Sequence, residues 1–521
     1  MFADIAAKSI DWCVFGSFAV YLVLMLAIGF LFTSKQGNMG DYFLGGRKMN
    51  KWVVALSAQA SDMSGWLLMG LPGAIYLGGF SEAWIGIGLA IGTYLNWKIV
   101  AQRLRHYSQL CKDSITIPDF IANRFRDTTG VSRLVAALII LVFFTFYTAS
   151  GFVSAAKLFS TMFPISYNAS LWIGALVVVG YTLFGGYMAV CWTDFVQGTL
   201  MFLAIVIVPA AVICGAGGFA DTVDQLNAIN GNLLNLFTSA STGKACGFIG
   251  LASCLAWGLG YFGMPHILVR FMSIDNPAEV KGSRRIAMTW VAISLGAAAA
   301  LGLVFHLYLK QRGLTLADVG GDPEKCFMVM INGIFNTGIC VRLFAGILLS
   351  AILAAIMSTA DSQLLVSASA FTNDLYGRVR RNASNKELVF VSRLAVGAVA
   401  IISIVLAMNT ESDFFKVVMK MVSFAWAGFG ASFGPLILLA LFWKRTNLAG
   451  AVSGMVVGAT TCFVWKFVLA AKYAAAHPIF NLYELAPGFV LAFLVTVVVS
   501  LLTKKPTPDM IAEFEKVDSA S

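Results

Sequence analysis

Long apolar runs without charges recur along the whole chain, and they constrain its fold more than any other feature of the sequence. A helix needs about 20 consecutive apolar residues to cross the hydrocarbon core of a bilayer. Charged residues make up only 12% of the chain, whereas a soluble domain carries about a quarter. We therefore expect an all-α membrane protein with about thirteen transmembrane helices. The expected spans lie near residues 12–33, 52–78, 83–104, 131–157, 167–186, 194–216, 246–269, 286–309, 341–370, 388–408, 415–443, 447–470 and 485–503.

The basic residues alternate along the chain as they do in multi-pass membrane proteins. The formal net charge is +10, and nucleic-acid binding would be another use for such an excess. Lys and Arg gather in alternate loops, for example around Arg103, Arg284 and Arg378, whereas segments 217–242 and 409–413 are nearly free of them. Because cytoplasmic loops carry the excess of Lys and Arg, we expect an outside N-terminus, a cytoplasmic C-terminus and no nucleic-acid partner.

A single transmembrane domain is expected over residues 1–503, followed by a short cytoplasmic tail at 504–521. The sequence has no Ser/His/Asp set, HExxH motif, Walker-type loop or Rossmann fingerprint. Its nine cysteines are scattered without metal-ligand spacing. We therefore expect neither an enzyme nor a bound cofactor, and the energy for any transport must come from an ion gradient.

Two of the expected spans are interrupted by Gly and Pro in the same way. One interruption lies within residues 58–73 and the other within residues 257–266. A broken helix leaves backbone groups unpaired, which lipid does not tolerate, so each break must face protein or a wet cavity. Paired breaks in corresponding positions are typical of inverted-repeat transporters.

The positions of the two breaks predict how the helices are organised. The broken spans are the second and the seventh, so five helices counted from each give two halves, helices 2–6 and helices 7–11. An odd number of helices per half places the halves in opposite orientation. We expect a 5+5 inverted-repeat core with repeats at 51–216 and 246–443, and peripheral helices at 12–33 and 447–503.

Asp62 lies in the middle of the first broken span. A carboxylate at the centre of a lipid-facing helix costs about 2.5–3.5 kcal/mol on insertion scales, so this side chain must face inward and have partners. Two roles remain open for Asp62. It could contribute negative charge to a cation site, or it could anchor the unwound turn through hydrogen bonds.

Ser358 and Thr359 are the best candidates to complete a cation site. Sodium, like calcium, is expected to prefer oxygen ligands, and the carbonyls of unwound backbone can supply them. The small residues around this pair permit close approach of another backbone. The two hydroxyls could instead bond carbonyls of their own helix, although the adjacent Asp361 and Ser362 favour a functional role.

Asp194 has two interpretations. It follows Trp192 and Thr193 at the predicted start of a span, where Asp is a favourable N-cap residue. The alternative is a second cation-linked site together with Asp361 and Ser362.

A substrate pocket is expected between the two breaks. The N-termini of half-helices direct their positive ends at an anionic group such as a carboxylate. Aromatic side chains can enclose the apolar part of a solute, and the candidates are Trp66, Tyr147, Trp257 and Tyr261. Aromatic residues of membrane helices also serve in packing and in interface belts.

At these motifs the sequence resembles the sodium/solute symporter family. The matching strings are 42–47, 58–73, 95–98, 143–147, 192–194, 257–266, 348–365 and 424–430, which cover nearly the whole chain in order. The resemblance implies a LeuT-type core, thirteen helices and a multi-pass protein of a bacterial cytoplasmic (inner) membrane. It also implies secondary active transport by alternating access, with sodium as co-substrate and L-proline as the imported solute.

The resemblance further implies roles for individual residues. The main sodium site would be formed by backbone groups of Ala60, Met63 and Ala355 and the hydroxyls of Ser358 and Thr359, supported by Asp62. The substrate and gate region would comprise Ser64, Gly65, Trp66, Tyr147, Trp257, Tyr261 and Pro265. Arg47 and Asp194 resemble positions that matter for coupling in the family, and Asp361 and Ser362 suggest a second cation site.

Sodium, L-proline or a similar small solute and the lipid bilayer are the expected partners, and the sequence shows no obligatory protein partner. Met264 stands where proline carriers usually have Gln, which keeps open another amino acid or a carboxylate as the solute. A passive channel would show repeated acidic rings along a continuous pore, and a sensor would carry a long cytoplasmic module. The sequence has neither feature.

Overall fold

The computed structural model describes residues 10–33, 39–182, 186–380 and 382–520. Those parts of the expected spans and tail that fall on residues 1–9, 34–38, 183–185, 381 and 521 lie outside this description. Within the described residues every regular element is a helix, and no strand is present. The prediction of an all-α protein is therefore confirmed.

The first half of the described chain forms eleven α-helices and four short 3-10 or π segments. They are α1 (Trp12–Thr33), α2 (Met39–Leu44), η1 (Gly45–Arg47), α3 (Lys51–Asp62), η2 (Trp66–Gly70), α4 (Leu71–Gly78), η3 (Phe80–Glu82), α5 (Ala83–Leu95), η4 (Asn96–Val100), α6 (Ala101–Leu110), α7 (Ile117–Arg124), α8 (Val131–Met162), α9 (Tyr167–Thr182), α10 (Tyr187–Gly215) and α11 (Phe219–Ile229).

The second half begins with the other interrupted span and ends with a short helix at the C-terminus. Its elements are α12 (Phe248–Ala256), η5 (Trp257–Gly263), α13 (Pro265–Ser273), η6 (Pro277–Glu279), α14 (Val280–Gln311), η7 (Ala317–Val319), η8 (Pro323–Lys325), α15 (Cys326–Ile334), α16 (Ile339–Ser369), η9 (Ala370–Tyr376), α17 (Gly377–Val379), α18 (Asn385–Ala407), α19 (Asp413–Lys416), α20 (Val418–Phe442), α21 (Leu448–Val464), η10 (Trp465–Ala470), α22 (Ala471–Tyr473), η11 (Pro478–Asn481), α23 (Leu485–Leu502) and α24 (Pro508–Ala520).

Nine helices of the described residues are long and apolar enough to cross a membrane, and the bent pair that joins α12 and η5 to α13 makes a tenth. The segments at 51–78 and 83–110 are divided into shorter helical pieces, and α9 has only 16 residues. The multi-pass prediction is therefore confirmed, and the count of thirteen spans stays a prediction.

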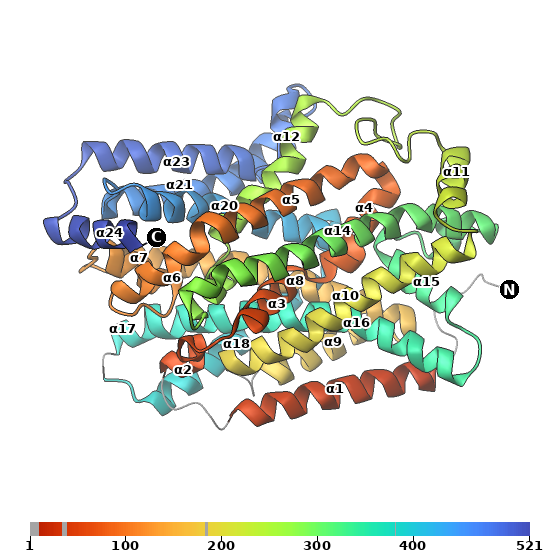
Figure 1. The fold of residues 1–521 in the computed structure, drawn as a ribbon, viewed down its shortest axis with the longest axis horizontal. Helices are drawn as coiled ribbons and strands as arrows, with labels where there is room; N and C mark the ends of the chain where they lie inside the picture. The colour runs from red at the N-terminus through yellow and green to blue at the C-terminus, as the bar shows by residue number, and fades with distance from the viewer. Residues whose placement is uncertain (1–9, 34–38, 183–185, 381, 521) are drawn as a thin grey trace.

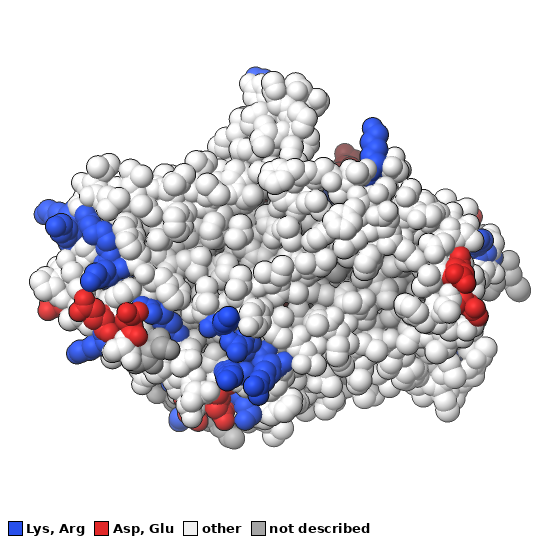
Figure 2. All heavy atoms as spheres, turned by 45° about the horizontal axis from the view of Figure 1, so that its top comes forward, with Lys and Arg blue, Asp and Glu red and all other residues white. Residues whose placement is uncertain are grey.

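The long helices run roughly along the long axis of the molecule (Figure 1). One end carries α24, and the opposite end carries α11 and α15. On the face drawn in Figure 2, most Lys and Arg side chains gather toward the end that carries α24. We call this the basic end and the opposite one the far end.

Helix α3 lies in the interior, because it packs against α10, α13, α14 and α16. Every residue from Ser57 to Asp62 is buried. The side chain of Asn50 caps the start of α3 by accepting hydrogen bonds from the backbone N–H groups of Trp52 and Val53. This helix therefore brings Asp62 into a protein interior instead of into lipid, as its charge requires.

The structure corrects one interpretation of Asp194. Helix α10 begins at Tyr187 with Gly186 as its N-cap residue, so Asp194 lies inside the helix and is fully buried. The N-cap interpretation is wrong, because the residues before Asp194 continue the helix instead of starting it.

Candidate functional site

The first interruption lies directly after Asp62. Helix α3 ends there, and Met63 has the non-helical dihedral angles φ −85° and ψ 72°. A π-helical turn follows at Trp66–Gly70 before α4 begins at Leu71. At Gly65 the chain passes so close to α8 that an added Cβ atom would lie 2.6 Å from the Oγ atom of Ser154. The break predicted within 58–73 is therefore confirmed, and glycine permits its close packing.

The second interruption is sharper. Helix α12 passes into the 3-10 turn η5, Met264 is extended, and Pro265 begins α13. The two arms are bent by 47°. A Cβ atom at Gly263 would overlap the backbone carbonyl of Phe429 on α20. This break lies within the predicted window 257–266, so that prediction is also confirmed.

Oxygen atoms from α3 and α16 converge just before the first break. The Oγ atom of Ser358 donates to the carbonyl of Ala60 at 2.8 Å, and the Oγ1 atom of Thr359 lies 3.4 Å from the same oxygen. Ser358 Oγ also lies 3.3 Å from the carbonyl of Ala355. The carbonyl of Met63 belongs to the turn itself, and all five residues are buried. This grouping offers the neutral oxygen ligands that a hard monovalent cation needs.

Asp62 joins the two breaks. Its Oδ2 atom accepts a 2.5 Å hydrogen bond from the hydroxyl of Tyr261 in η5. Its backbone carbonyl accepts from Tyr147 Oη at 3.2 Å and from Trp66 Nε1 at 3.1 Å. The other carboxylate oxygen, Oδ1, has no hydrogen-bond partner among the described residues. The geometry supports the anchoring role, and the unpartnered oxygen leaves open a contribution of Asp62 to a cation site.

A chain of aromatic side chains leads from Asp62 through Tyr261 to α20. The indole Nε1 of Trp426 donates to the carbonyl of Trp257 at 2.8 Å, and the ring of Trp426 lies edge-on to that of Tyr261 with centroids 5.0 Å apart. Of the predicted substrate residues, those in the first break and on α8 and η5 meet around Asp62. These are Ser64, Gly65, Trp66, Tyr147 and Tyr261. Trp257 lines a separate cavity together with residues of α20 and of the segment before α23, and Pro265 lines a small cavity beside Arg270.

Asp194 forms a buried ion pair that the sequence analysis missed. Its Oδ2 atom lies 3.1 Å from Arg270 Nη2 and accepts a 2.7 Å hydrogen bond from Ser57. Arg270 Nη2 also donates to Ser362 at 2.5 Å, which links α13 to α16. Asp361 is adjacent and fully buried, and its Oδ2 atom has no hydrogen-bond partner among the described residues. The structure therefore brings Asp194 and Ser362 together through Arg270.

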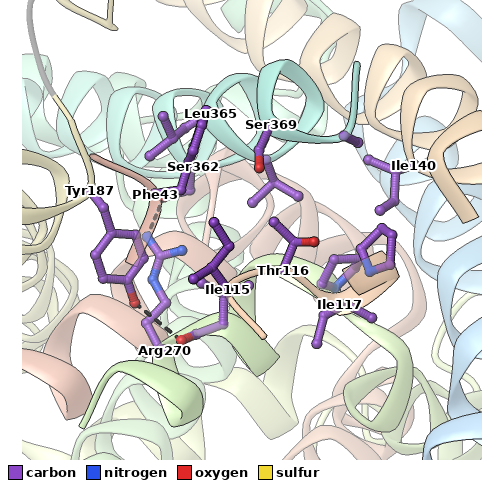
Figure 3. A pocket seen from close by; sticks show the side chains of 15 residues that line it. Phe43, Ile115, Thr116, Ile117, Ile140, Tyr187, Arg270, Ser362, Leu365 and Ser369 are labelled. Atoms are coloured by element: carbon purple, nitrogen blue, oxygen red, sulfur yellow. Dashed lines mark hydrogen bonds between the residues drawn. The ribbon is translucent and has the colours of Figure 1, made fainter. Parts of the chain in front are cut away.

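Arg270 also borders a cavity of about 20 Å³ on the basic-end side of the second break. Figure 3 shows its guanidinium directed toward Ser362, with Tyr187 on the other side. Such a volume holds about one water molecule. An arginine within the apolar stretch 267–272 was the signal available in the sequence, because an intramembrane charge is functional by default.

Arg47 lies apart from this group, at the basic end. Its guanidinium bonds the Oδ1 atom of Asp113 at 2.7 Å, the carbonyl of Met272 at 2.7 Å and the carbonyl of Ser114 at 2.8 Å. It thus ties the segment before α3 to the end of α13 and to the segment before α7. The hydrogen bonds of Arg47 therefore include none to Asp194, Asp361 or Ser362.

A second ionic group that sequence reasoning missed lies at the far end. Lys157 on α8 lies 2.5 Å from Glu324 and 2.7 Å from Asp322. Glu324 in turn accepts hydrogen bonds from the backbone N–H groups of Val418 and Met419, each 3.1 Å long, at the start of α20. The sequence could not place Glu324 beside α20, because 94 residues separate it from Val418.

Comparison with known proteins identifies the family. The model of the sodium:solute symporter family matches residues 42–458. The chain belongs to the sodium:solute symporter family. Members of this family are transporters instead of enzymes, and sodium is a co-substrate of the transport and not a resident cofactor.

Curated relatives in the family cover almost the whole chain. A sodium/proline symporter of Haemophilus influenzae is 46% identical over 97% of this chain and 97% of its own length. A high-affinity proline transporter of Bacillus subtilis is 47% identical over 94% of this chain and 98% of its own length. A sodium/proline symporter of Escherichia coli is 44% identical over 96% of each chain.

Two solved structures share the fold. A Na+-coupled sialic acid symporter in a substrate-bound outward-open state superposes with a TM-score of 0.77, at 20% identity over 95% of this chain and 99% of that chain. A nucleobase-cation-symport-1 family transporter in a closed conformation superposes with a TM-score of 0.56. It is 12% identical over 92% of this chain and 99% of that chain. The helical arrangement in Figure 1 is therefore that of known ion-coupled symporters.

Proposed function

We propose that this protein imports L-proline together with sodium by alternating access, across a bacterial cytoplasmic membrane. The observation that carries the sodium part is the convergence of the Ala60 carbonyl with the hydroxyls of Ser358 and Thr359 at the first break. The choice of proline is supported by the relatives that carry this solute and align over at least 94% of the chain.

The proposed sodium ligands are the carbonyls of Ala60, Met63 and Ala355 and the hydroxyls of Ser358 and Thr359. In the structure the Ser358 hydroxyl donates to the carbonyl of Ala60. A cation between these atoms needs the lone pairs of both oxygens, so the hydroxyl hydrogen must turn away. Sodium would therefore replace a direct hydrogen bond with a cation bridge between α3 and α16, and its binding would hold the broken helix in place.

The proposed proline site lies beside this cation site. The positive N-terminal ends of the half-helices that begin near Trp66 and Pro265 suit the carboxylate of an amino acid. The aromatic rings of Trp66, Tyr147 and Tyr261 suit its apolar ring. Asp62 accepts hydrogen bonds from all three of these aromatic residues, so solute and sodium would share the same anchor. The residues proposed to bind proline also include Ser64, Gly65 and Trp257.

Asp194, Asp361 and Ser362 form the proposed second cation-linked site. In the structure the positive charge that faces Asp194 is the guanidinium of Arg270. A sodium ion at this site would use Asp194 Oδ1 and Asp361 Oδ2, neither of which has a hydrogen-bond partner among the described residues. We propose that Arg47 contributes to coupling from the basic end, by tying the segment before α3 to the end of α13 and to the segment before α7.

The proposed orientation places the basic end in the cytoplasm and the far end outside, because Lys and Arg favour the cytoplasmic side. It puts the N-terminus outside and the tail that forms α24 inside. We also propose that 51–216 and 246–443 are two inverted repeats, since each starts with an interrupted span. Rocking of the repeats would open the site to one side at a time.

Uptake of labelled proline into proteoliposomes tests this function. An inward sodium gradient with an interior-negative potential should drive accumulation, because one charge that moves down 100 mV supplies about 2.3 kcal/mol. That energy allows about fifty-fold accumulation. Uptake that is indifferent to sodium would refute symport. If sodium drives uptake of another amino acid or of a carboxylate but not of proline, the choice of proline is wrong and sodium-coupled symport stands.

A further inference from the structure

A groove of about 350 Å³ lies between α3, α10 and α14, and none of the residues proposed to hold sodium or proline lines it. Trp52, Arg285 and Thr289 on its rim are exposed. Helices α10 and α14 are both long and apolar enough to cross a membrane. The groove therefore faces the surrounding lipid and is separate from the buried sites around Asp62 and Arg270.

The less exposed part of the groove is apolar. Trp290 is buried, and its ring lies beside that of Phe202 with centroids 6.3 Å apart. Leu56 of α3 lines the same groove. The indole Nε1 of Trp290 donates to the carbonyl of Gly198 at 3.2 Å, so the indole needs no further hydrogen-bond partner there. This wall suits a hydrocarbon chain.

The rim of the groove is basic. Arg285 lines the groove, and its guanidinium has no ion pair or hydrogen bond among the described residues. Lys281, one helical turn earlier on α14, is exposed and likewise has no ion pair among them. Glu279 is already paired, since its Oε1 atom lies 3.5 Å from Lys51 Nζ. An excess of positive charge thus borders an apolar groove, which fits an anion that carries a hydrocarbon tail.

The groove begins near the basic end, where α3 and α14 start side by side. Ser283 Oγ on α14 donates to the carbonyl of Lys51, the first residue of α3, at 3.1 Å. Trp52 is 55% exposed in the first turn of α3, and tryptophan is enriched where a membrane meets water. Arg285 lies about 8 Å along α14 from its first residue, and Trp290 lies about 8 Å farther. The charge is therefore near the interface, and the apolar wall lies deeper in the bilayer.

We propose that this groove binds one anionic phospholipid from the leaflet at the basic end, with its phosphate at Arg285 and an acyl chain along Phe202 and Trp290. Basic pockets between transmembrane helices are suited to anionic head groups. A zwitterionic lipid would bring a cation of its own to Arg285, and free phosphate has no chain to fill the apolar part. An anionic phospholipid satisfies both parts of the groove.

The groove is connected to the proposed sodium site through α10. Trp290 on the groove wall bonds the carbonyl of Gly198, and a Cβ atom added at Gly198 would lie 3.1 Å from the Cβ atom of Ala60. A lipid that fills the space between α3 and α14 would hold α3 against α10 and keep Ala60 facing Ser358. Bound lipid would therefore favour sodium binding. This effect on sodium rests on the proposed function, whereas the lipid site itself does not.

Crosslinking with a phosphatidylglycerol that carries a diazirine in one acyl chain tests the lipid site. The purified full-length protein is irradiated with this lipid in detergent, and the modified peptides are mapped by mass spectrometry. Peptides of α3, α10 and α14 that line the groove should be labelled. Unlabelled phosphatidylglycerol at roughly ten times its half-competing concentration should reduce this labelling about tenfold. The same amount of phosphatidylcholine or of inorganic phosphate should leave it unchanged.

Two pairs of variants separate the groove from lipid contact in general. Arg285→Gln should raise the half-competing concentration of phosphatidylglycerol about fivefold, the usual contribution of one basic residue at a membrane surface. Arg284→Gln removes the same charge from a side chain that lies over Tyr94 of α5 instead, and it should change nothing. Thr289→Trp fills the groove and should abolish the labelling, whereas Val405→Trp at an exposed position of α18 should not.

Three results would overturn the lipid site. They are labelling that phosphatidylcholine competes equally well, labelling that responds alike to Arg284→Gln and Arg285→Gln, and crosslinks through the groove to a second copy of the chain in place of lipid.

Binding of radioactive sodium in nanodiscs tests the effect on the sodium site. In nanodiscs of phosphatidylcholine with added phosphatidylglycerol, Arg285→Gln should bind sodium about fivefold more weakly than the unaltered protein. In phosphatidylcholine alone the two should be equal. If labelling of the groove depends on Arg285 but sodium affinity does not, the lipid site stands and the connection through Gly198 is wrong. If sodium binds in neither lipid, the proposed function fails, and the crosslinks still decide the lipid site.

Discussion

At the scale of single residues, the site depends on buried polar atoms that are only partly satisfied by hydrogen bonds. Asp62 is bonded on one carboxylate oxygen by Tyr261, and its other oxygen has no hydrogen-bond partner among the described residues. Burying a charge in this way is costly unless a cation or several donors compensate for it. The unpartnered oxygen is therefore a reason to expect that sodium binding stabilises this region.

Substitution of Asp62 separates its electrostatic role from its anchoring role. Asp62→Ala should raise the sodium concentration for half-maximal proline uptake at least about tenfold, a loss of about 1.4 kcal/mol, while protein abundance falls far less. Tyr261→Phe should have a smaller effect in the same direction, because it removes one donor and keeps the charge. Tyr308→Phe, which removes a hydroxyl bonded to the carbonyl of Val329 instead, serves as the control. Normal sodium dependence in Asp62→Ala would leave only the structural role.

The pair of Asp194 and Arg270 should behave as one unit. Removal of one member leaves the other charge buried and unpaired, so Asp194→Asn or Arg270→Met alone should cost about 3–5 kcal/mol of stability. The double variant should lose less than the sum of the two single losses. Thermal unfolding of the purified protein in detergent measures this. Lys444→Met, which breaks an exposed pair with Glu515, should change stability by no more than about 1 kcal/mol; additive losses at Asp194 and Arg270 would contradict the pairing.

At the scale of elements, the two interrupted spans function because other backbones approach them closely. In the second break, Gly258 packs directly against Gly92 of α5, and a Cβ atom at either position would overlap the backbone of the other segment. Glycine is needed at these two positions because no room is left for a Cβ atom, and not because of its dihedral freedom. The close packing of α5 against η5 thus limits the positions that the unwound turn can adopt.

Alanine at Gly92 should therefore be harmful. Gly92→Ala should destabilise the protein by about 1–3 kcal/mol through overpacking and should impair uptake more than binding of sodium. Gly296→Ala on α14, where an added Cβ atom meets nothing within 4 Å, should change stability by no more than about 1 kcal/mol. Thermal unfolding and uptake of both variants check this. Equal behaviour of the two variants would refute the close-packing account.

The breaks are predictable from the sequence because Gly, Pro and a carboxylate such as Asp62 are tolerated within an apolar span only where the span faces protein or water. The facing pair Ser358 and Thr359 is also predictable, since hydroxyls among small residues suit a close helix contact. The ion pairs of Arg270 and Lys157 are not, because an apolar pattern does not specify which faces of distant helices meet. The N-cap interpretation of Asp194 fails because α10 already begins at Tyr187, and a continuous apolar pattern does not mark where a helix starts.

At the scale of the whole molecule, each end is held by polar contacts between segments that are distant in the sequence. Lys157 and Glu324 connect α8, η8 and α20 at the far end, while Arg47 connects three segments at the basic end. Alternating access requires these two sets of contacts to break in turn. Binding of a cation between α3 and α16 would stabilise the contacts at one end relative to those at the other, and so shift the protein between its two open states.

Equilibrium binding of radioactive sodium to the purified protein, without solute and without a gradient, tests the central claim most directly. The Ser358→Ala, Thr359→Ala double variant should bind sodium at least about tenfold more weakly than the unaltered protein. Ser350→Ala, which removes a buried hydroxyl of the same helix that bonds the carbonyl of Gly346, should bind it normally. Unchanged sodium affinity in the double variant would contradict a cation site between the broken helix α3 and α16.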